Sequence, residues 1–122
     1  MSWLKTSKLG AENVSSHGGG MARMSEPMIT EQAQTDLDEA WDYLSIRNLA
    51  AADRLIDRFV TAARAHARFP ESGRSREPLG PEIRSFLVKP YVAFYRPVEN
   101  TIEIVRFLHG RRNVDRIMKM GE

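Results

Sequence analysis

The sequence contains no cysteine, and no apolar run among its 122 residues approaches the roughly 20 that a transmembrane helix needs. The lack of cysteine excludes disulfides, thiolate zinc sites and thiol catalysis, and it is compatible with a reducing compartment. We therefore expect a cytoplasmic protein that does not enter a membrane. Three scattered histidines without spaced carboxylates form no metal-site pattern, and the glycine spacing matches neither a phosphate-binding loop nor a dinucleotide motif. No metal and no cofactor are expected.

What the chain does contain is typical of one soluble globular domain, with 42% hydrophobic and 28% charged residues. The net charge of +2 hides an asymmetry between its two halves. Residues 21–67 hold 5 basic and 8 acidic side chains, whereas residues 68–122 hold 11 and 7, so the halves carry −3 and +4. The basic half could pair with the acidic half, with an acidic partner or with a phosphate backbone.

The first 24 residues differ from those that follow. They include Ser-Ser-His-Gly-Gly-Gly at positions 15–20, show no sustained periodicity and lack the apolar segment of a signal peptide. Met21, Met24 and Met28 are plausible alternative starts. We interpret residues 1–24 as a flexible N-terminal extension or a start-site artefact, and residues 25–122 as one domain.

Two helices are predicted at the start of this domain. Thr30 is a suitable N-cap for a helix over residues 31–47, whose acidic side chains we expect mostly on outer or flanking faces: Asp36, Asp38, Glu39 and Asp42. After a break at Asn48, a second apolar stripe of helical period continues until Pro70 stops it. Because the connection is short, the two helices should form an antiparallel hairpin.

The second half of the domain predicts a sheet. Residues 70–81 have the composition of a surface loop without regular structure. Residues 83–88, 92–96 and 101–108 are rich in β-branched and aromatic residues, which predicts an antiparallel meander with one face under the helices and Phe94, Ile104 and Leu108 in the core. A short C-terminal helix is expected over residues 113–120. The fold class is α+β: a helical hairpin packed on a small antiparallel β-sheet.

The last strand ends in a cluster of basic side chains: Arg106, His109, Arg111 and Arg112. Guanidinium groups suit carboxylate, phosphate or aromatic partners, and the only acidic neighbours in the sequence are Glu103 and Asp115. A buried role would need paired acceptors, so this end of the sheet is predicted to contact another molecule. The alternative is a solvated strand exit.

Several matches occur in the same order as in a known family. They are Ala33, Asp36-Leu37 and Trp41-Asp42-Tyr43 in the first helix, Ala51-Ala52 and Ile56 in the second, then Phe69-Pro70, Gly73, Ile83-Arg84, Tyr91, Phe94-Tyr95, and 104–108 followed by His109-Gly110-Arg111-Arg112. In these residues the chain resembles the RelE/ParE superfamily of bacterial toxins, and its ParE branch most closely.

The resemblance implies a toxin of a type II toxin–antitoxin module that inhibits DNA gyrase by binding, without catalytic residues. It also implies a ParD-like antitoxin with a ribbon-helix-helix fold and an acidic amphipathic tail, a hetero-oligomer with it, and DNA contact only through it. The expected target-binding residues are Arg84, Arg106, His109, Arg111 and Arg112. The expected antitoxin-binding residues are Arg47, Arg54, Arg58 and Arg64, on the helical hairpin.

The enzymatic branch of the same superfamily, which cleaves messenger RNA on the ribosome, is the main alternative. In that interpretation His109 is the acid or base, Glu82 assists, and the arginines of the sheet stabilise the phosphate. However, no aromatic residue follows Phe107, and basic residues are fewer than ribosome binding usually requires. An unrelated binding module is a third possibility.

Overall fold

The computed structural model describes residues 26–111. The predicted extension, Arg112 and the expected C-terminal helix therefore lie outside the described residues. Within them the elements are two helices, one short 3₁₀ turn and five strands. Within residues 26–111, neither α-helix combines the length and the apolar composition that a membrane span requires.

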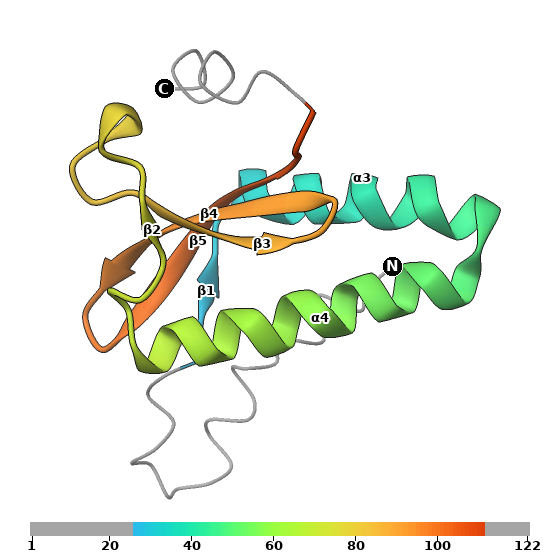
Figure 1. Cartoon of the computed structure of the whole chain (residues 1–122). Helices are drawn as coiled ribbons and strands as arrows, with labels where there is room; N and C mark the ends of the chain where they lie inside the picture. Colours follow the sequence, from blue (N-terminus) through green and yellow to red (C-terminus); the bar gives the residue numbers. More distant parts are fainter. Residues whose placement is uncertain (1–25, 112–122) are drawn as a thin grey trace, which may run out of the picture.

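The two helices follow each other with a single residue between them. Helix α3 (Glu31–Arg47) begins at Thr30, whose hydroxyl accepts a hydrogen bond from the Ala33 amide at 3.1 Å. Asn48 ends α3 and caps helix α4 (Leu49–Arg68) by accepting from the Ala51 amide at 2.9 Å. This one-residue connection turns the chain back on itself and confirms the predicted hairpin (Figure 1).

The predicted meander is confirmed as three antiparallel strands: β3 (Arg84–Val88), β4 (Tyr91–Val98) and β5 (Thr101–His109). The whole sheet is nevertheless mixed, in the order β1-β5-β4-β3-β2, because β1 (Met28–Ile29) pairs with β5 in parallel.

The loop predicted over residues 70–81 is also more regular than expected. It contains β2 (Arg74–Ser75), which pairs with β3, and a 3₁₀ turn, η2 (Glu77–Leu79). A two-residue strand is stabilised by pairing with its neighbour and is too short to show a periodicity of its own, so no sequence pattern predicted it.

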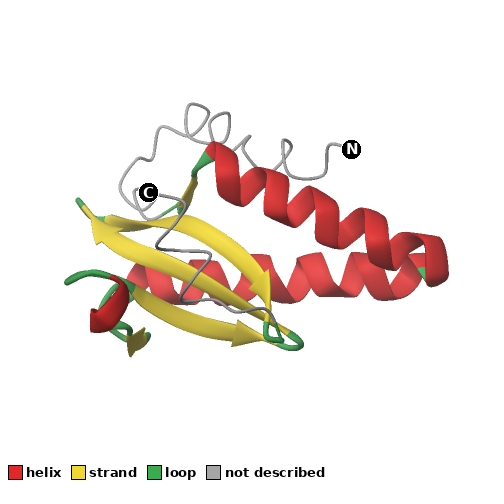
Figure 2. Ribbon diagram, turned by 90° about the horizontal axis from the view of Figure 1, so that it is seen from above, coloured by secondary structure: helices red, strands yellow, loops and turns green. Residues whose placement is uncertain are grey.

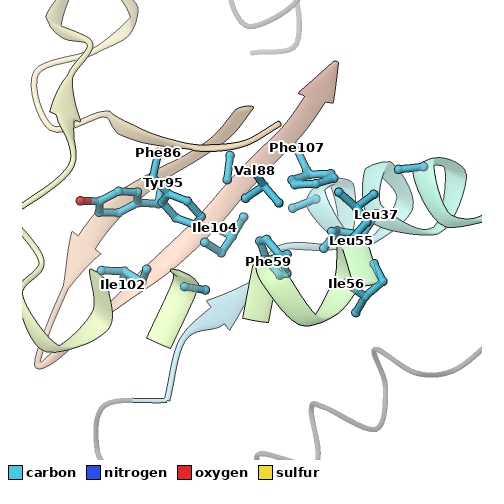
Figure 3. Close-up of a cluster of buried hydrophobic side chains, with 14 of the residues drawn as sticks. Leu37, Leu55, Ile56, Phe59, Phe86, Val88, Tyr95, Ile102, Ile104 and Phe107 are labelled. Atoms are coloured by element: carbon cyan, nitrogen blue, oxygen red, sulfur yellow. The ribbon is translucent and has the colours of Figure 1, made fainter. Parts of the chain in front are cut away.

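The helices cover one face of the sheet and enclose the main core. Its largest fully buried side chains include Leu37, Phe59, Tyr95, Ile104 and Phe107 (Figure 3). Alternation along β4 sends Val92 and Phe94 to the opposite face, where they form a second cluster with Leu108. The three predicted core residues are thus all buried, but Phe94 and Leu108 belong to a different cluster from Ile104.

Candidate partner-binding surface

The five residues expected to contact a target do not form one cluster. Arg84 begins β3, Arg106 lies within β5, and His109 and Arg111 lie at the end of β5; Arg112 is outside the described range. The register pairs Arg84 with Tyr95 and His109 with Tyr91. These two levels of β4 are about 13 Å apart, at roughly 3.3 Å per residue. Arg84 and His109 therefore lie toward opposite ends of the sheet.

Arg106 is engaged inside the protein. Its Nε donates to Asp36 Oδ2 at 2.8 Å and its Nη2 to Asp36 Oδ1 at 3.2 Å, with only 16% of the Arg106 side chain and 5% of the Asp36 side chain exposed. The same Asp36 Oδ2 accepts the Phe107 amide at 2.9 Å. Because β1 pairs only with Glu103 and Ile104, this amide is on an open edge of β5 and needs an acceptor.

The outer or flanking position expected for Asp36 is therefore wrong. So is the expectation that a sheet arginine would lack a buried acceptor, because the acceptor comes from α3, 70 residues away in sequence. Sequence neighbours of Arg106 gave no sign of this pair.

Arg84 is also turned toward the protein's own backbone. Its Nη1 donates to the carbonyl oxygens of Gly73 at 2.9 Å and Glu71 at 3.1 Å. The neighbouring Tyr95 hydroxyl donates to Pro70 O at 2.9 Å and accepts from the Gly73 amide at 2.8 Å. Burial raises the pKa of the Tyr95 phenol, which keeps it protonated as a donor. Arg84 and Tyr95 together fasten the segment after α4 to the sheet.

The exit of β5 has a different character. The ring of His109 meets Tyr91 edge-on at 5.2 Å between centroids, and Tyr91 stacks on Phe107 at 4.9 Å. His109 Nδ1 accepts a hydrogen bond from the Arg111 amide at 3.0 Å, and the Gly110 amide donates to Pro90 O at 2.8 Å. The end of β5 is therefore held against the β3–β4 turn, and Arg111 itself is exposed.

The four arginines expected to bind an antitoxin are also spread out. Arg58 donates to Lys89 O at 2.8 Å, beside the β3–β4 turn. Arg64 instead faces the β1 side, where it is 3.6 Å from Glu26 and borders a small slot with Ile29, Phe59 and Val60 in its lining. Since β1 and β3 lie on opposite sides of β5 and β4, these two arginines flank α4 on different sides.

The remaining two lie nearer the tip of the hairpin. Arg54 is exposed on α4, and Arg47 stacks its guanidinium over the Tyr43 ring at 4.1 Å from the centroid. Tyr43 is close enough to Tyr91 for an electrostatic effect: burial raises the pKa of Tyr91, and the Tyr43 phenol raises it further. The hairpin continues past the sheet at this end (Figure 2).

One surface thus combines members of both predicted sets. We call it the β5-exit surface; its residues are Tyr43, Arg47, Arg58, Lys89, Tyr91, His109 and Arg111. Within residues 26–111 the ion pairs involve Arg64, Arg96 and Arg106, so the four cations of this surface are not neutralised by a described carboxylate. Sequence reasoning missed Lys89 and both tyrosines as members. Tyr91 could have been found from the hairpin pairing that places it opposite His109.

Comparison with known proteins identifies the family of this fold. The model of the ParE toxin of type II toxin–antitoxin systems, parDE, matches residues 28–114. The chain belongs to the ParE toxin family. It is therefore a toxin of the RelE/ParE superfamily, as the sequence resemblance predicted.

Relatives of this ParE-family toxin have both family names. Toxin ParE3 of Caulobacter vibrioides is 30% identical over 92 residues, which cover 75% of this chain and 92% of that protein. Toxin ParE1 of Mycobacterium tuberculosis is 32% identical over 91 residues, covering 73% and 93%. Toxin RelE2 of Caulobacter vibrioides is 34% identical over 89 residues, covering 73% and 99%.

A solved structure shares the fold. The chromosomal ParDE system from P. aeruginosa contains a chain that matches with a TM-score of 0.59 and 21% identity, over 70% of this toxin and 96% of that chain. The α+β arrangement of a helical hairpin on a sheet is thus found in both.

Proposed function

We propose that this toxin inhibits DNA gyrase by binding it, without catalysing a reaction, and that a cognate antitoxin neutralises it. The observation that carries the proposal is the separation of the groups that cleavage of RNA would need. His109 lies at the end of β5, whereas Arg84 begins β3 and Glu82 lies in the turn before it, and Arg106 is occupied by Asp36. Acid–base catalysis requires its groups within hydrogen-bond reach of one substrate.

The β5-exit surface suits recognition of a protein better than cleavage. Its arginines are fixed in part by internal contacts, Arg47 to Tyr43 and Arg58 to Lys89, and they keep exposed donors. Preorganised arginines beside tyrosines are typical of the residues that dominate protein interfaces. We assign the contact with gyrase to this surface.

The proposed antitoxin is ParD-like, and it would form a hetero-oligomer with the toxin and provide its contact with DNA. The family model describes parDE modules, and the structural neighbour is a ParDE system. Exposed arginines on the hairpin offer this partner charged donors.

Two assays on the purified toxin decide between inhibition and cleavage. In a gyrase supercoiling assay we expect dose-dependent inhibition that the antitoxin relieves. In a ribosome-dependent assay we expect messenger RNA to stay intact. Intact supercoiling together with cleavage that His109→Ala abolishes would contradict the proposal and support the ribonuclease.

A further inference from the structure

We propose that a band of exposed cations on α4 and at the β5 exit contacts the phosphate backbone of the DNA that gyrase holds, so that the toxin binds the gyrase–DNA complex more tightly than gyrase alone. The residues of this cationic band are Arg54, Arg58, Lys89 and Arg111. The inference rests on the proposed function, because it takes gyrase as the target. The contact is separate from the one with DNA that the antitoxin would provide.

The band begins with two arginines on one side of α4. Arg54 and Arg58 are exposed and four residues apart, so they are neighbours on the helix surface, about 6 Å apart along its axis. Asp53 and Asp57 have the same spacing on the adjoining stripe, and Asp53 accepts a hydrogen bond from Trp41 Nε1 of α3 at 3.3 Å. Arg58 instead reaches the β3–β4 turn. This part of α4 therefore has its acidic and basic side chains on different sides.

The β3–β4 turn connects these arginines to the β5 exit. Arg58 Nη2 donates to Lys89 O at 2.8 Å, and the next residue, Pro90, accepts the Gly110 amide at 2.8 Å. Two hydrogen bonds and one peptide unit span on the order of 10 Å, and Arg111 follows directly. Together with the preceding turn of α4, the band extends over about 16 Å.

The charge of the band suits a polyanion. None of its four members is among the ion pairs that residues 26–111 form, which involve Arg64, Arg96 and Arg106. B-DNA has one negative charge per roughly 1.7 Å of helix axis, so about 16 Å of duplex presents about nine phosphates. Several phosphates can therefore contact the band at once, and each contact releases counterions, which favours binding.

Exposed aliphatic side chains are not part of this band. Ile46 and Leu49 lie around the α3–α4 connection. Leu87 is paired with Val92, whose side chain lies on the sheet face away from the helices. An amphipathic protein segment binds through apolar contacts as well as charges. A phosphate backbone needs donors of positive charge, which are what the band provides.

A single introduced cysteine tests whether DNA lies at the band, because the sequence contains no other. Thr61→Cys is exposed on α4, three residues after Arg58, and Ser75→Cys is exposed on β2, toward the opposite end of the sheet from the β5 exit. Each variant is labelled with an iron chelate that generates hydroxyl radicals and is mixed with gyrase and a gyrase-bound DNA fragment. We expect cleavage of the DNA from position 61 and none from position 75.

The outcomes of this experiment separate the inference from the proposed function. Equal cleavage from both positions, or none from position 61 while the labelled toxin is bound to gyrase, would overturn the inference. Absence of the toxin from the gyrase–DNA complex would contradict the proposed function itself, and the inference would fail with it.

Salt dependence tests the charge of the band. Arg54→Gln changes a member that lies outside the β5-exit surface, and Arg68→Gln is the matched change at the exposed end of α4. Arg54→Gln should weaken binding to the gyrase–DNA complex at least threefold. It should also lower the slope of log affinity against log salt concentration by about 0.9, the value for one phosphate contact.

The controls are binding without DNA and the Arg68→Gln variant. The affinity of Arg54→Gln for gyrase alone, and both affinities of Arg68→Gln, should stay within twofold of the wild type. Equal weakening of Arg54→Gln binding with and without DNA would overturn the inference and assign the band to an acidic protein surface of gyrase.

Discussion

Arg84 and Arg106 lie in the sheet, and Arg111 follows its strand β5. The first two have structural roles, whereas Arg111 is available to a partner. Arg84 donates to two backbone carbonyls and Arg106 to a buried carboxylate, and both residues are partly buried. At the β5-exit surface, Arg58 has one contact with a backbone carbonyl but remains exposed, and Arg111 is exposed as well. Residue type and proximity in sequence therefore do not separate a structural arginine from a binding one. Burial of the guanidinium against acceptors from other elements does, as at Arg106.

Removing the acceptor of an inward arginine should have the largest effect. Asp36→Ala leaves the Arg106 guanidinium and the Phe107 amide without their partner, so we expect a loss of about 3 kcal/mol in the free energy of unfolding. Urea unfolding measures it. Replacing both partners, with Asp36→Ala and Arg106→Met, should recover part of the loss; a single-variant loss below about 1 kcal/mol would show that the pair contributes little.

The next largest effect on stability is expected at Gly73, whose backbone is hydrogen-bonded to Arg84 and Tyr95. A Cβ on Gly73 would collide with the Tyr95 hydroxyl and lie 2.9 Å from Ser85 O. We expect Gly73→Ala to cost about 2 kcal/mol, because the segment must shift away from Tyr95. Gly110→Ala is the matched change at the β5 exit, where the Cβ would be 3.2 Å from Pro90 O in an exposed turn. It should lower the free energy of unfolding by less than Gly73→Ala does. Equal losses would remove this contrast between the two ends.

Arg84→Ala and Arg111→Ala should differ in their effect on stability. Losing the two carbonyl contacts of Arg84, which is partly buried, should lower the free energy of unfolding by about 1 kcal/mol. Arg111→Ala removes no internal side-chain contact among those described, so its unfolding curve should superimpose on that of the wild type. A destabilised Arg111→Ala protein would place this arginine in the structural group.

The smallest expected effect is a pH dependence of the free energy of unfolding, which arises from His66 on α4. His66 packs on Phe86 at 4.6 Å and its Nδ1 lies 2.6 Å from Ser72 Oγ. Burial lowers the pKa of this imidazole from 6.5, so the unfolded chain binds the proton more tightly. The stabilisation that neutral His66 contributes is fully present at a pH above the pKa of His66 in the unfolded chain. It is lost as the pH falls toward the lower pKa of His66 in the folded protein.

Urea midpoints measured between about pH 7 and about pH 5 should therefore decrease more in the wild type than in His66→Gln. His109→Gln, at the other end of the sheet, is the control for loss of a histidine. A pH dependence that His66→Gln leaves unchanged would assign it to other groups.

The helices and the three long strands were predictable because their periodicity spans many residues. Thr30 and Asn48 gave the helix boundaries, and Pro70 gave the approximate end of α4. β2 and the burial of Asp36 were not predictable, because each depends on a partner that only the folded chain brings near. At the candidate site, the proximity of His109 and Arg111 was predictable from their positions in the sequence. The proximity of Arg58 to the β5 exit was not, because it depends on the packing of α4 against the β3–β4 turn, where Arg58 contacts Lys89 O.

The exposed arginines of the β5-exit surface test most directly where gyrase binds. Gyrase supercoiling is measured with the Arg58→Ala and Arg111→Ala double variant, beside a double variant with Arg68→Ala and Arg74→Ala. We expect the first variant to lose inhibition at least tenfold, while its free energy of unfolding falls by no more than about 1 kcal/mol through loss of the Arg58 contact with Lys89 O. The second variant should inhibit like the wild type. Equal inhibition by both variants would contradict the assignment of the target contact to the β5-exit surface.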